Sequence, residues 1–169
     1  MSAEELAAAE RRLAEMGFRI PPSYRAFLTE RDGGRPLECV FSYSRDGRDS
    51  DSIVQCFLGV GAVARPKIDL LYVAEDMPTG VLPIALDPGG NHVCLDGREG
   101  RDGPVLFWDH EERVEDDPED ERNLYFIAPD LQTFLDGLTE LPPLEDELLP
   151  SHGAGGASFD WRRLFRRRR

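Results

Sequence analysis

The chain has few cysteines, almost no lysine and no long apolar run. Its three cysteines, Cys39, Cys56 and Cys94, are odd in number and far apart, which argues against a disulfide framework. Lys67 is the only lysine, and nineteen of the 20 basic residues are arginines. No stretch of 18 apolar residues occurs, so we expect no segment that spans a membrane.

The signatures of several enzyme classes are also missing. The sequence has no G-x-S-x-G, no Walker phosphate loop and no H-E-x-x-H metal motif. The acidic start, MSAEE, lacks the basic residues and apolar stretch of a secretion signal. Together with the low cysteine content, this predicts a cytoplasmic protein. We expect no enzymatic activity, no cofactor and no metal.

Acidic residues dominate the composition. The 169 residues include 33 acidic and 20 basic side chains, for a net charge of -13. Such a chain is repelled by phosphate backbones, which argues against general nucleic-acid binding, and it attracts basic proteins. The length fits one domain with a short tail.

The charge is concentrated in two segments. Residues 109–121 hold nine acids and one arginine, whereas residues 160–169 hold six arginines and one acid. We predict that the acidic segment contacts a partner, although a solvated charge run is the plainer alternative. A calcium loop is disfavoured, because the acids lack its spacing and its central glycine. The predicted partner-binding residues are Asp109, Glu111, Glu112, Glu115, Asp116, Asp117, Glu119 and Asp120.

The C-terminal segment combines arginines with an apolar stripe formed by Trp161, Leu164 and Phe165. We predict that this stripe contacts either the acidic body of the same chain or a partner groove. A disordered end is the plainer alternative. An anionic membrane is disfavoured, because it would repel the body.

Hydrophobic periodicity predicts an α+β fold in residues 1–141, followed by a linker and tail in residues 142–169. The architecture expected is an antiparallel sheet of about five to six strands with packed N-terminal, inserted and C-terminal helices. Polar residues 44–52 are interpreted as a loop. Helices are expected at 3–16, from 20–23 to 32–34, at 66–76 and from Pro129, and strands at 37–42, 53–60, 81–86, 92–96, 104–108 and 123–127.

Two weaker patterns suggest other chemistry. Residues 59–64 fit the dinucleotide fingerprint G-x-G-x-x-A between a strand and a helix. We reject that interpretation, because the later strands are linked as hairpins and no second βαβ unit follows. His92 and Cys94 would share one face of a strand, but no second ligand pair has a fitting spacing, so packing against the core is the favoured interpretation.

Three stretches, in this order, resemble the SUKH superfamily, which is named after a fungal cell-wall synthesis regulator. They are residues 20–34 (IPPSYRAFLTERDGG), residues 82–96 (LPIALDPGGNHVCLD) continuing into 105–111 (VLFWDHE), and residues 127–138 (IAPDLQTFLDGL). The resemblance covers roughly residues 4–140, and its central stretch is the most specific. Asn91 and Leu131 depart from the pattern, where an acid and an aromatic residue are common.

This resemblance implies an α+β fold without known catalysis and a role in binding proteins. Many bacterial members are immunity proteins that neutralise a cognate toxin, often a nuclease. We therefore expect a cytoplasmic bacterial immunity protein whose acidic surface binds a basic toxin domain. A regulatory adaptor of the same fold is the alternative, and a small nucleotide-binding enzyme that uses the glycines of residues 59–64 is a more distant one.

Overall fold

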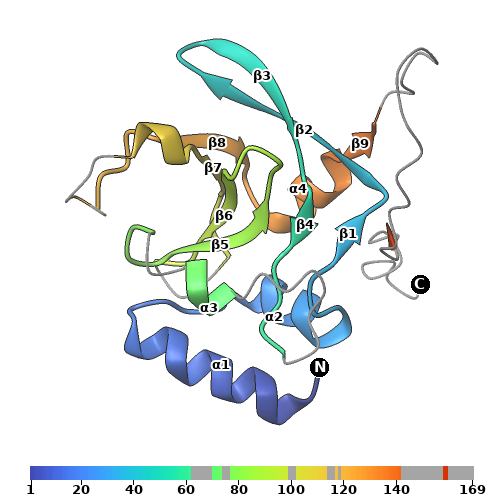
Figure 1. Ribbon diagram of the computed structural model, residues 1–169, viewed down its shortest axis with the longest axis vertical. Helices are drawn as coiled ribbons and strands as arrows, with labels where there is room; N and C mark the ends of the chain where they lie inside the picture. Colours follow the sequence, from blue (N-terminus) through green and yellow to red (C-terminus); the bar gives the residue numbers. More distant parts are fainter. Residues whose placement is uncertain are drawn as a thin grey trace.

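The computed structural model describes residues 1–61, 70–73, 77–98, 102–113, 117, 119–141 and 158–159. The helices are α1 (Ala3–Glu15), α2 (Pro22–Glu30), α3 (Leu70–Val73), the 3₁₀ helix η2 (His110–Glu112) and α4 (Leu131–Gly137). The strands are β1 (Arg35–Pro36), β2 (Glu38–Arg45), β3 (Arg48–Ile53), β4 (Cys56–Phe57), β5 (Val81–Leu86), β6 (His92–Asp96), β7 (Val105–Trp108), β8 (Leu124–Ala128), β9 (Thr139–Glu140) and β10 (Ser158–Phe159). Helices α1, α2 and α3 lie below a central layer of strands, α4 lies at the level of the strands, and a long hairpin projects above them (Figure 1).

The largest sheet has the order β4-β5-β6-β7-β8, and all its neighbouring strands are antiparallel. Strands β5, β6, β7 and β8 follow one another along the chain as a meander, as their turn residues predict. Nearly every side chain of β5 and β6 is buried, since other elements pack on both faces. The predicted α+β class is confirmed.

A second sheet has the order β3-β2-β9, and it shows that the loop predicted at residues 44–52 is wrong. These residues form the end of β2 and most of β3, joined by a tight turn at Asp46 and Gly47. Both turn residues have positive φ, 52° and 74°, the conformation that matches the twist of a two-residue hairpin. The prediction failed because most of this hairpin is exposed and polar, so it lacks an apolar alternation.

The predicted strand at 53–60 is also corrected. Ile53 ends β3 in the second sheet, whereas Cys56 and Phe57 form β4 at the edge of the larger sheet. One apolar run thus passes between two sheets, which composition alone does not reveal. The backbone of Val54, just after β3, still donates a 2.8 Å hydrogen bond to Cys39 of β2.

Local capping explains where the helices begin. Ser2 and Glu5 form a reciprocal capping box at the start of α1, with hydrogen bonds of 2.8 and 3.1 Å. Pro129 does not open the last helix as predicted, because Asp130 is its N-cap and accepts a 2.7 Å bond from the amide of Thr133. Within the predicted helix 66–76, the structure describes α3 alone, and the remaining residues lie outside the described part.

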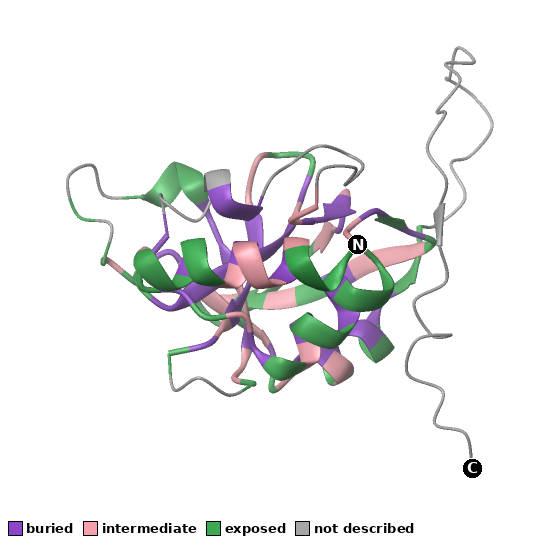
Figure 2. Ribbon diagram, turned by 90° about the horizontal axis from the view of Figure 1, so that it is seen from below, coloured by how far each residue is buried: buried purple, intermediate pink, exposed green. Residues whose placement is uncertain are grey.

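A row of aromatic rings joins the helices to both sheets. Phe27 of α2 packs on Phe57 of β4, and Phe57 reaches Phe134 of α4. Phe134 contacts Phe41 of β2, which in turn contacts Phe107 of β7. The buried residues therefore lie between the layers, while the outward face of α1 is exposed (Figure 2).

The C-terminal tail contributes one short described element. Ser158 and Phe159 pair in parallel with Arg35 and Pro36 of β1. Apart from this strand, the predicted linker and tail at 142–169 lie outside the described residues. In the part of the chain that is described, no helix combines the length and apolar character needed to cross a bilayer.

Candidate functional site

Asp109 anchors the start of the acidic segment. It follows β7 directly, and its carboxylate accepts a 3.0 Å hydrogen bond from the amide of Glu111, which caps η2. Its backbone exchanges hydrogen bonds with Asn123: the Asp109 amide donates to the Asn123 carbonyl at 3.0 Å, and Asn123 Nδ2 donates to the Asp109 carbonyl at 2.9 Å. Asp109 is only 7% exposed, so this predicted partner-binding residue has a structural role.

Arg45, at the end of β2, ties the β2–β3 hairpin to η2. Its guanidinium donates to Asp109 Oδ2 at 3.1 Å and also pairs with the carboxylate of Glu112. The hydroxyl of Tyr125 donates to the same Glu112 carboxylate, and the Arg45 guanidinium lies 5.5 Å from the centre of the Tyr125 ring. This network fixes the hairpin beside the acidic segment.

The far end of the acidic segment is held by a second group of contacts. Glu119 accepts hydrogen bonds from the amide and the hydroxyl of Thr79, and the hydroxyl bond is 2.6 Å long. Arg98 pairs with Glu121 and with Asp96. The hydrogen bonds from Arg98 lower the pKa of Asp96 below its usual value.

Asp120 is paired locally. The guanidinium of Arg122 lies 2.7 Å from its carboxylate, and the resulting hydrogen bonds lower the pKa of Asp120. Glu111 and Asp117 are exposed, and no ion pair to either is seen among the described residues. These two carboxylates are the ones most available to a partner.

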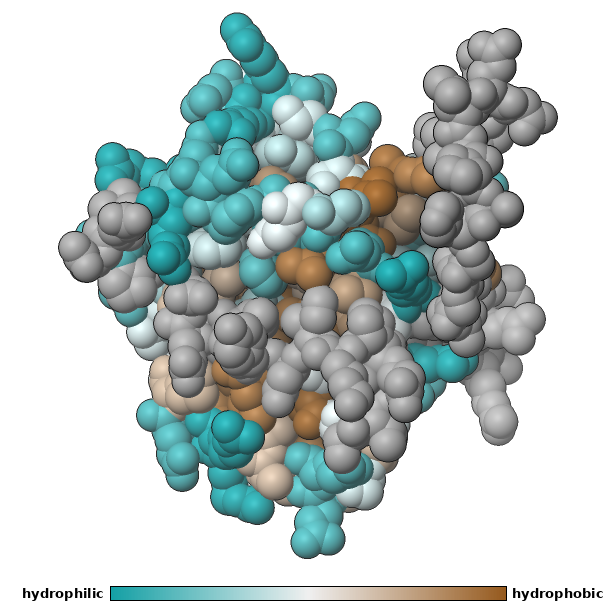
Figure 3. All heavy atoms as spheres, viewed as in Figure 1, coloured by the Kyte–Doolittle hydropathy of each residue, from teal (hydrophilic) through white to brown (hydrophobic). Residues whose placement is uncertain are grey.

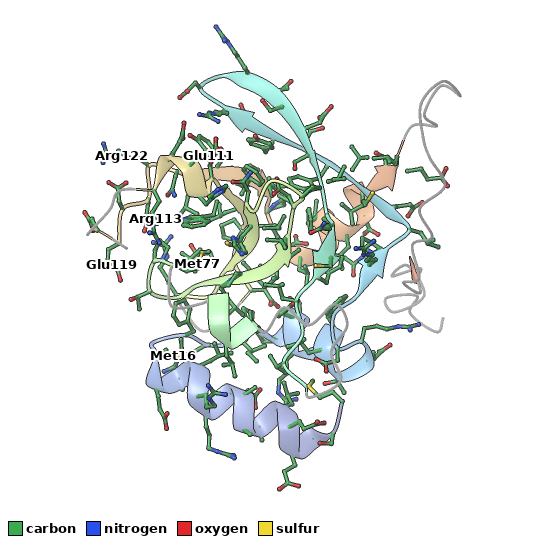
Figure 4. The ribbon with its side chains drawn as sticks, in the orientation of Figure 1. Met16, Met77, Glu111, Arg113, Glu119 and Arg122 are labelled. Carbon is green, nitrogen blue, oxygen red and sulfur yellow. The ribbon has the colours of Figure 1, made fainter. Side chains whose placement is uncertain are left out.

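Five of the predicted site residues lie outside the part of the chain that the structure describes. Glu115 and Asp116 lie outside the described residues, and so do Trp161, Leu164 and Phe165 of the tail. The described members of the acidic segment come from η2 and the approach to β8, and the labelled Glu111, Arg113, Glu119 and Arg122 all lie on one flank of the molecule (Figure 4).

The hairpin adds carboxylates that the sequence interpretation missed. Asp46, Asp49 and Asp51 are exposed on the turn and on β3, and Asp51 accepts a 2.6 Å bond from Ser42. The Asp46-Gly47 dipeptide was the signal that could have identified this hairpin. Hydrophilic residues cover the hairpin and the neighbouring flank (Figure 3). We call the exposed carboxylates of the hairpin, Glu111, Glu112, Asp117 and Glu119 together the acidic face.

The glycine-rich turn at residues 59–61 is occupied by a carboxylate of the chain itself. Asp32 Oδ1 accepts hydrogen bonds from the amides of Val60 at 2.8 Å and Gly61 at 3.0 Å. A phosphate group would need such amides, and the negative charge of Asp32 would repel it. A Cβ on Gly61 would lie 2.1 Å from Asp32 Oδ2, so a larger residue there would displace this carboxylate from the two amides.

The pair His92 and Cys94 lies in the core. Both side chains are buried; His92 packs against Trp108 at 5.5 Å between ring centroids, and the Cys94 sulfur lies 3.9 Å from that of Met77. Burial raises the pKa of the Cys94 thiol well above its usual value, which keeps the sulfur protonated. Within the described residues, no group of three or more His, Cys, Asp or Glu side chains is placed to hold a metal ion.

Comparisons with known proteins agree with this fold. The chain is 32% identical to the SPbeta prophage-derived uncharacterized protein YokK of Bacillus subtilis (strain 168), over 144 residues that cover 75% of this chain and 70% of the relative. No solved structure gives a significant match. The model of the SMI1 / KNR4 family (SUKH-1) matches residues 1–137, which includes the first two stretches that carry the resemblance and all but the last residue of the third. The chain therefore belongs to the SMI1 / KNR4 family (SUKH-1).

Proposed function

We propose that this protein is an immunity protein, which neutralises a bacterial toxin by binding its basic catalytic domain through the acidic face. The proposal combines family membership with the charge of the chain. The similarity to a prophage-derived protein is consistent with it. The protein would block access of substrate to the toxin and would perform no chemistry itself.

The observation that carries the proposal is the way the acidic face is built. Buried Asp109, together with Arg45 and Thr79, anchors the segment, and Glu111 and Asp117 remain exposed. Ordered carboxylates lose less side-chain entropy on binding than mobile ones. The held carboxylates of Glu112 and Glu119 present negative charges at fixed positions, as the phosphates of a nucleic acid do, and Glu111 and Asp117 add exposed charge beside them.

Electrostatics predict how such a face acts. A toxin that cleaves nucleic acid needs a basic cleft to bind phosphates. Opposite charges on two proteins speed their encounter, and this effect weakens as salt screens the charges. The acidic face therefore favours rapid, salt-sensitive capture of a basic domain.

Growth rescue provides the test. Candidate toxin domains encoded by neighbouring genes are each expressed in a bacterial host, with and without this protein. We expect growth only when the native protein is co-expressed. The variant Glu111→Lys/Asp117→Lys should fail to rescue, because it adds four positive charge units to the face.

A matched control carries the same charge change elsewhere. Glu15 and Glu30 are exposed at the ends of α1 and α2, far from η2 (Figure 1). The variant Glu15→Lys/Glu30→Lys should rescue growth as the native protein does. Toxicity that the native protein does not relieve would count against an immunity role and favour a regulatory adaptor of the same family.

A further inference from the structure

Two leucines are exposed side by side at one end of the second sheet. Leu37 is 55% exposed and Leu141 is 49% exposed. Strands β2 and β9 pair with Glu38 opposite Glu140, and continuing this antiparallel register by one residue places Leu37 opposite Leu141. Hydrophobic atoms are visible at this end of the molecule beside β9 (Figure 3). We call Leu37 and Leu141 the leucine patch.

The pairing of β10 with β1 points β10 toward this patch. The two strands are parallel, with Ser158 beside Arg35 and Phe159 beside Pro36. Leu37 directly follows Pro36, so the direction of β10 leads toward the leucine patch. With a rise of about 3.3 Å per residue in a strand, Trp161 needs only two steps to reach the level of Glu38.

We propose that residues 160–169 of this chain dock on the leucine patch. This segment contains the apolar residues Trp161, Leu164 and Phe165 and six arginines. The apolar residues would cover Leu37 and Leu141, and the arginines would meet the acidic body.

Two features favour a contact within one chain. Strand β10 ends beside Pro36, next to Leu37, so a segment that follows β10 along the chain has a high effective concentration at the patch. The exposed carboxylate of Glu140 lies at this end of the β2–β9 ladder and suits the arginine-rich segment.

Docking would also shield an edge strand of the second sheet. Strand β9 is an edge of the order β3-β2-β9, and exposed edges next to apolar residues invite association between copies. The tail would act as a cover for this edge. This inference does not depend on the proposed function, because the acidic face lies on the hairpin and η2, away from β1 and β9 (Figure 1).

Hydrogen exchange of the full chain tests the proposal. The variant Trp161→Ser/Leu164→Ser/Phe165→Ser removes the apolar stripe and leaves every arginine. We expect peptides that contain Leu37 or Leu141 to exchange about tenfold more slowly in the native protein than in the variant, which corresponds to about 1.4 kcal/mol of docking free energy. Peptides from β6 should exchange equally in both, which verifies that the variant is folded.

The complementary variant changes the patch. Leu37→Ser/Leu141→Ser should make a native tail exchange faster and expose Trp161 to acrylamide quenching, read in a Trp108→Phe background with Trp161 as the reporter. The same exchange in native and stripe variants would overturn the proposal. Protection that rises with protein concentration and a dimeric mass would assign the patch to a second copy instead. Protection seen only with phosphatidylserine vesicles would assign the stripe to a membrane.

Discussion

Tyr24 illustrates how the family motif of residues 20–34 supports the fold. Its ring is fully buried and stacks on Phe27 at 5.4 Å, while its hydroxyl lies 2.6 Å from the carbonyl oxygen of Leu58 and 2.9 Å from that of Ile84. The Ile84 carbonyl also accepts a 2.8 Å bond from the Leu58 amide. The hydroxyl has one hydrogen to donate, and we assign it to the Leu58 carbonyl, because the Ile84 carbonyl already accepts a hydrogen bond from the Leu58 amide.

Replacing Tyr24 with phenylalanine keeps the ring and removes this donor. Losing one partner of a buried hydrogen bond costs about 1–3 kcal/mol, so we expect Tyr24→Phe to lower the free energy of unfolding by that amount. The matched control is Tyr125→Phe, which removes a hydroxyl bonded to the exposed carboxylate of Glu112. A surface change of that kind should stay within about 0.5 kcal/mol.

Urea denaturation followed by circular dichroism measures both variants. The midpoint difference multiplied by a shared m-value gives the change in free energy without a long extrapolation. Equal effects at Tyr24 and Tyr125, or no effect at Tyr24, would refute the assignment of a buried, stabilising hydrogen bond to the motif.

Three further predictions concern stability, each measured by urea denaturation. Gly33 has φ of +78°, and a Cβ there would lie 2.7 Å from a backbone oxygen, so Gly33→Ala should lower the free energy of unfolding by at least about 2 kcal/mol. Gly47 has open space around it, so Gly47→Ala should lower it by about 1 kcal/mol. A larger loss at Gly47 than at Gly33 would contradict the close packing at Gly33. Burial raises the pKa of Tyr24 and of Cys94, so the folded state keeps these protons at a pH where the unfolded state loses them. The free energy of unfolding should therefore be highest below pH 9 and should fall as the pH rises past the ordinary pKa values of cysteine, 9.0, and tyrosine, 10.0. A urea midpoint that stays constant up to pH 11 would contradict this. Arg45→Ala should cost roughly 1 kcal/mol, because it leaves a buried carboxylate without its ion pair, and an unchanged midpoint would mean that this pair is not formed in solution.

The parts of the fold that the sequence predicted well are those with strong local signals. The meander of β5, β6 and β7 alternates apolar runs with Gly- and Asp-rich turns, and α1 has a clear stripe at Leu6, Ala9 and Leu13. The first half of β2 was predicted as a strand, but residues 44–52 of the β2–β3 hairpin were missed because nearly all of them are polar. The turn residues, Asp46 and Gly47, carried the necessary information, but a polar run without apolar alternation is typical of a loop.

The candidate site was predicted only in outline. Charge density identified the 109–121 segment, but charge says nothing about which carboxylates face inward. Asp109 is held by Arg45, which is 64 positions earlier in the chain, and Glu119 is held by Thr79, 40 positions earlier. Such distant pairings depend on the tertiary fold, so only the structure shows that Asp109 is buried and that Glu119, although exposed, is held in place.

The acidic face as a binding surface is the central claim, and association kinetics test it most directly. Stopped-flow mixing with the toxin domain identified by growth rescue would compare native protein, Glu111→Lys/Asp117→Lys and Glu15→Lys/Glu30→Lys at low and at high salt. We predict that the first variant associates about tenfold or more slowly at low salt, with a smaller change in dissociation and a weaker salt dependence, while the second matches the native protein. Equal association rates for the two variants would contradict the claim that this face captures the partner.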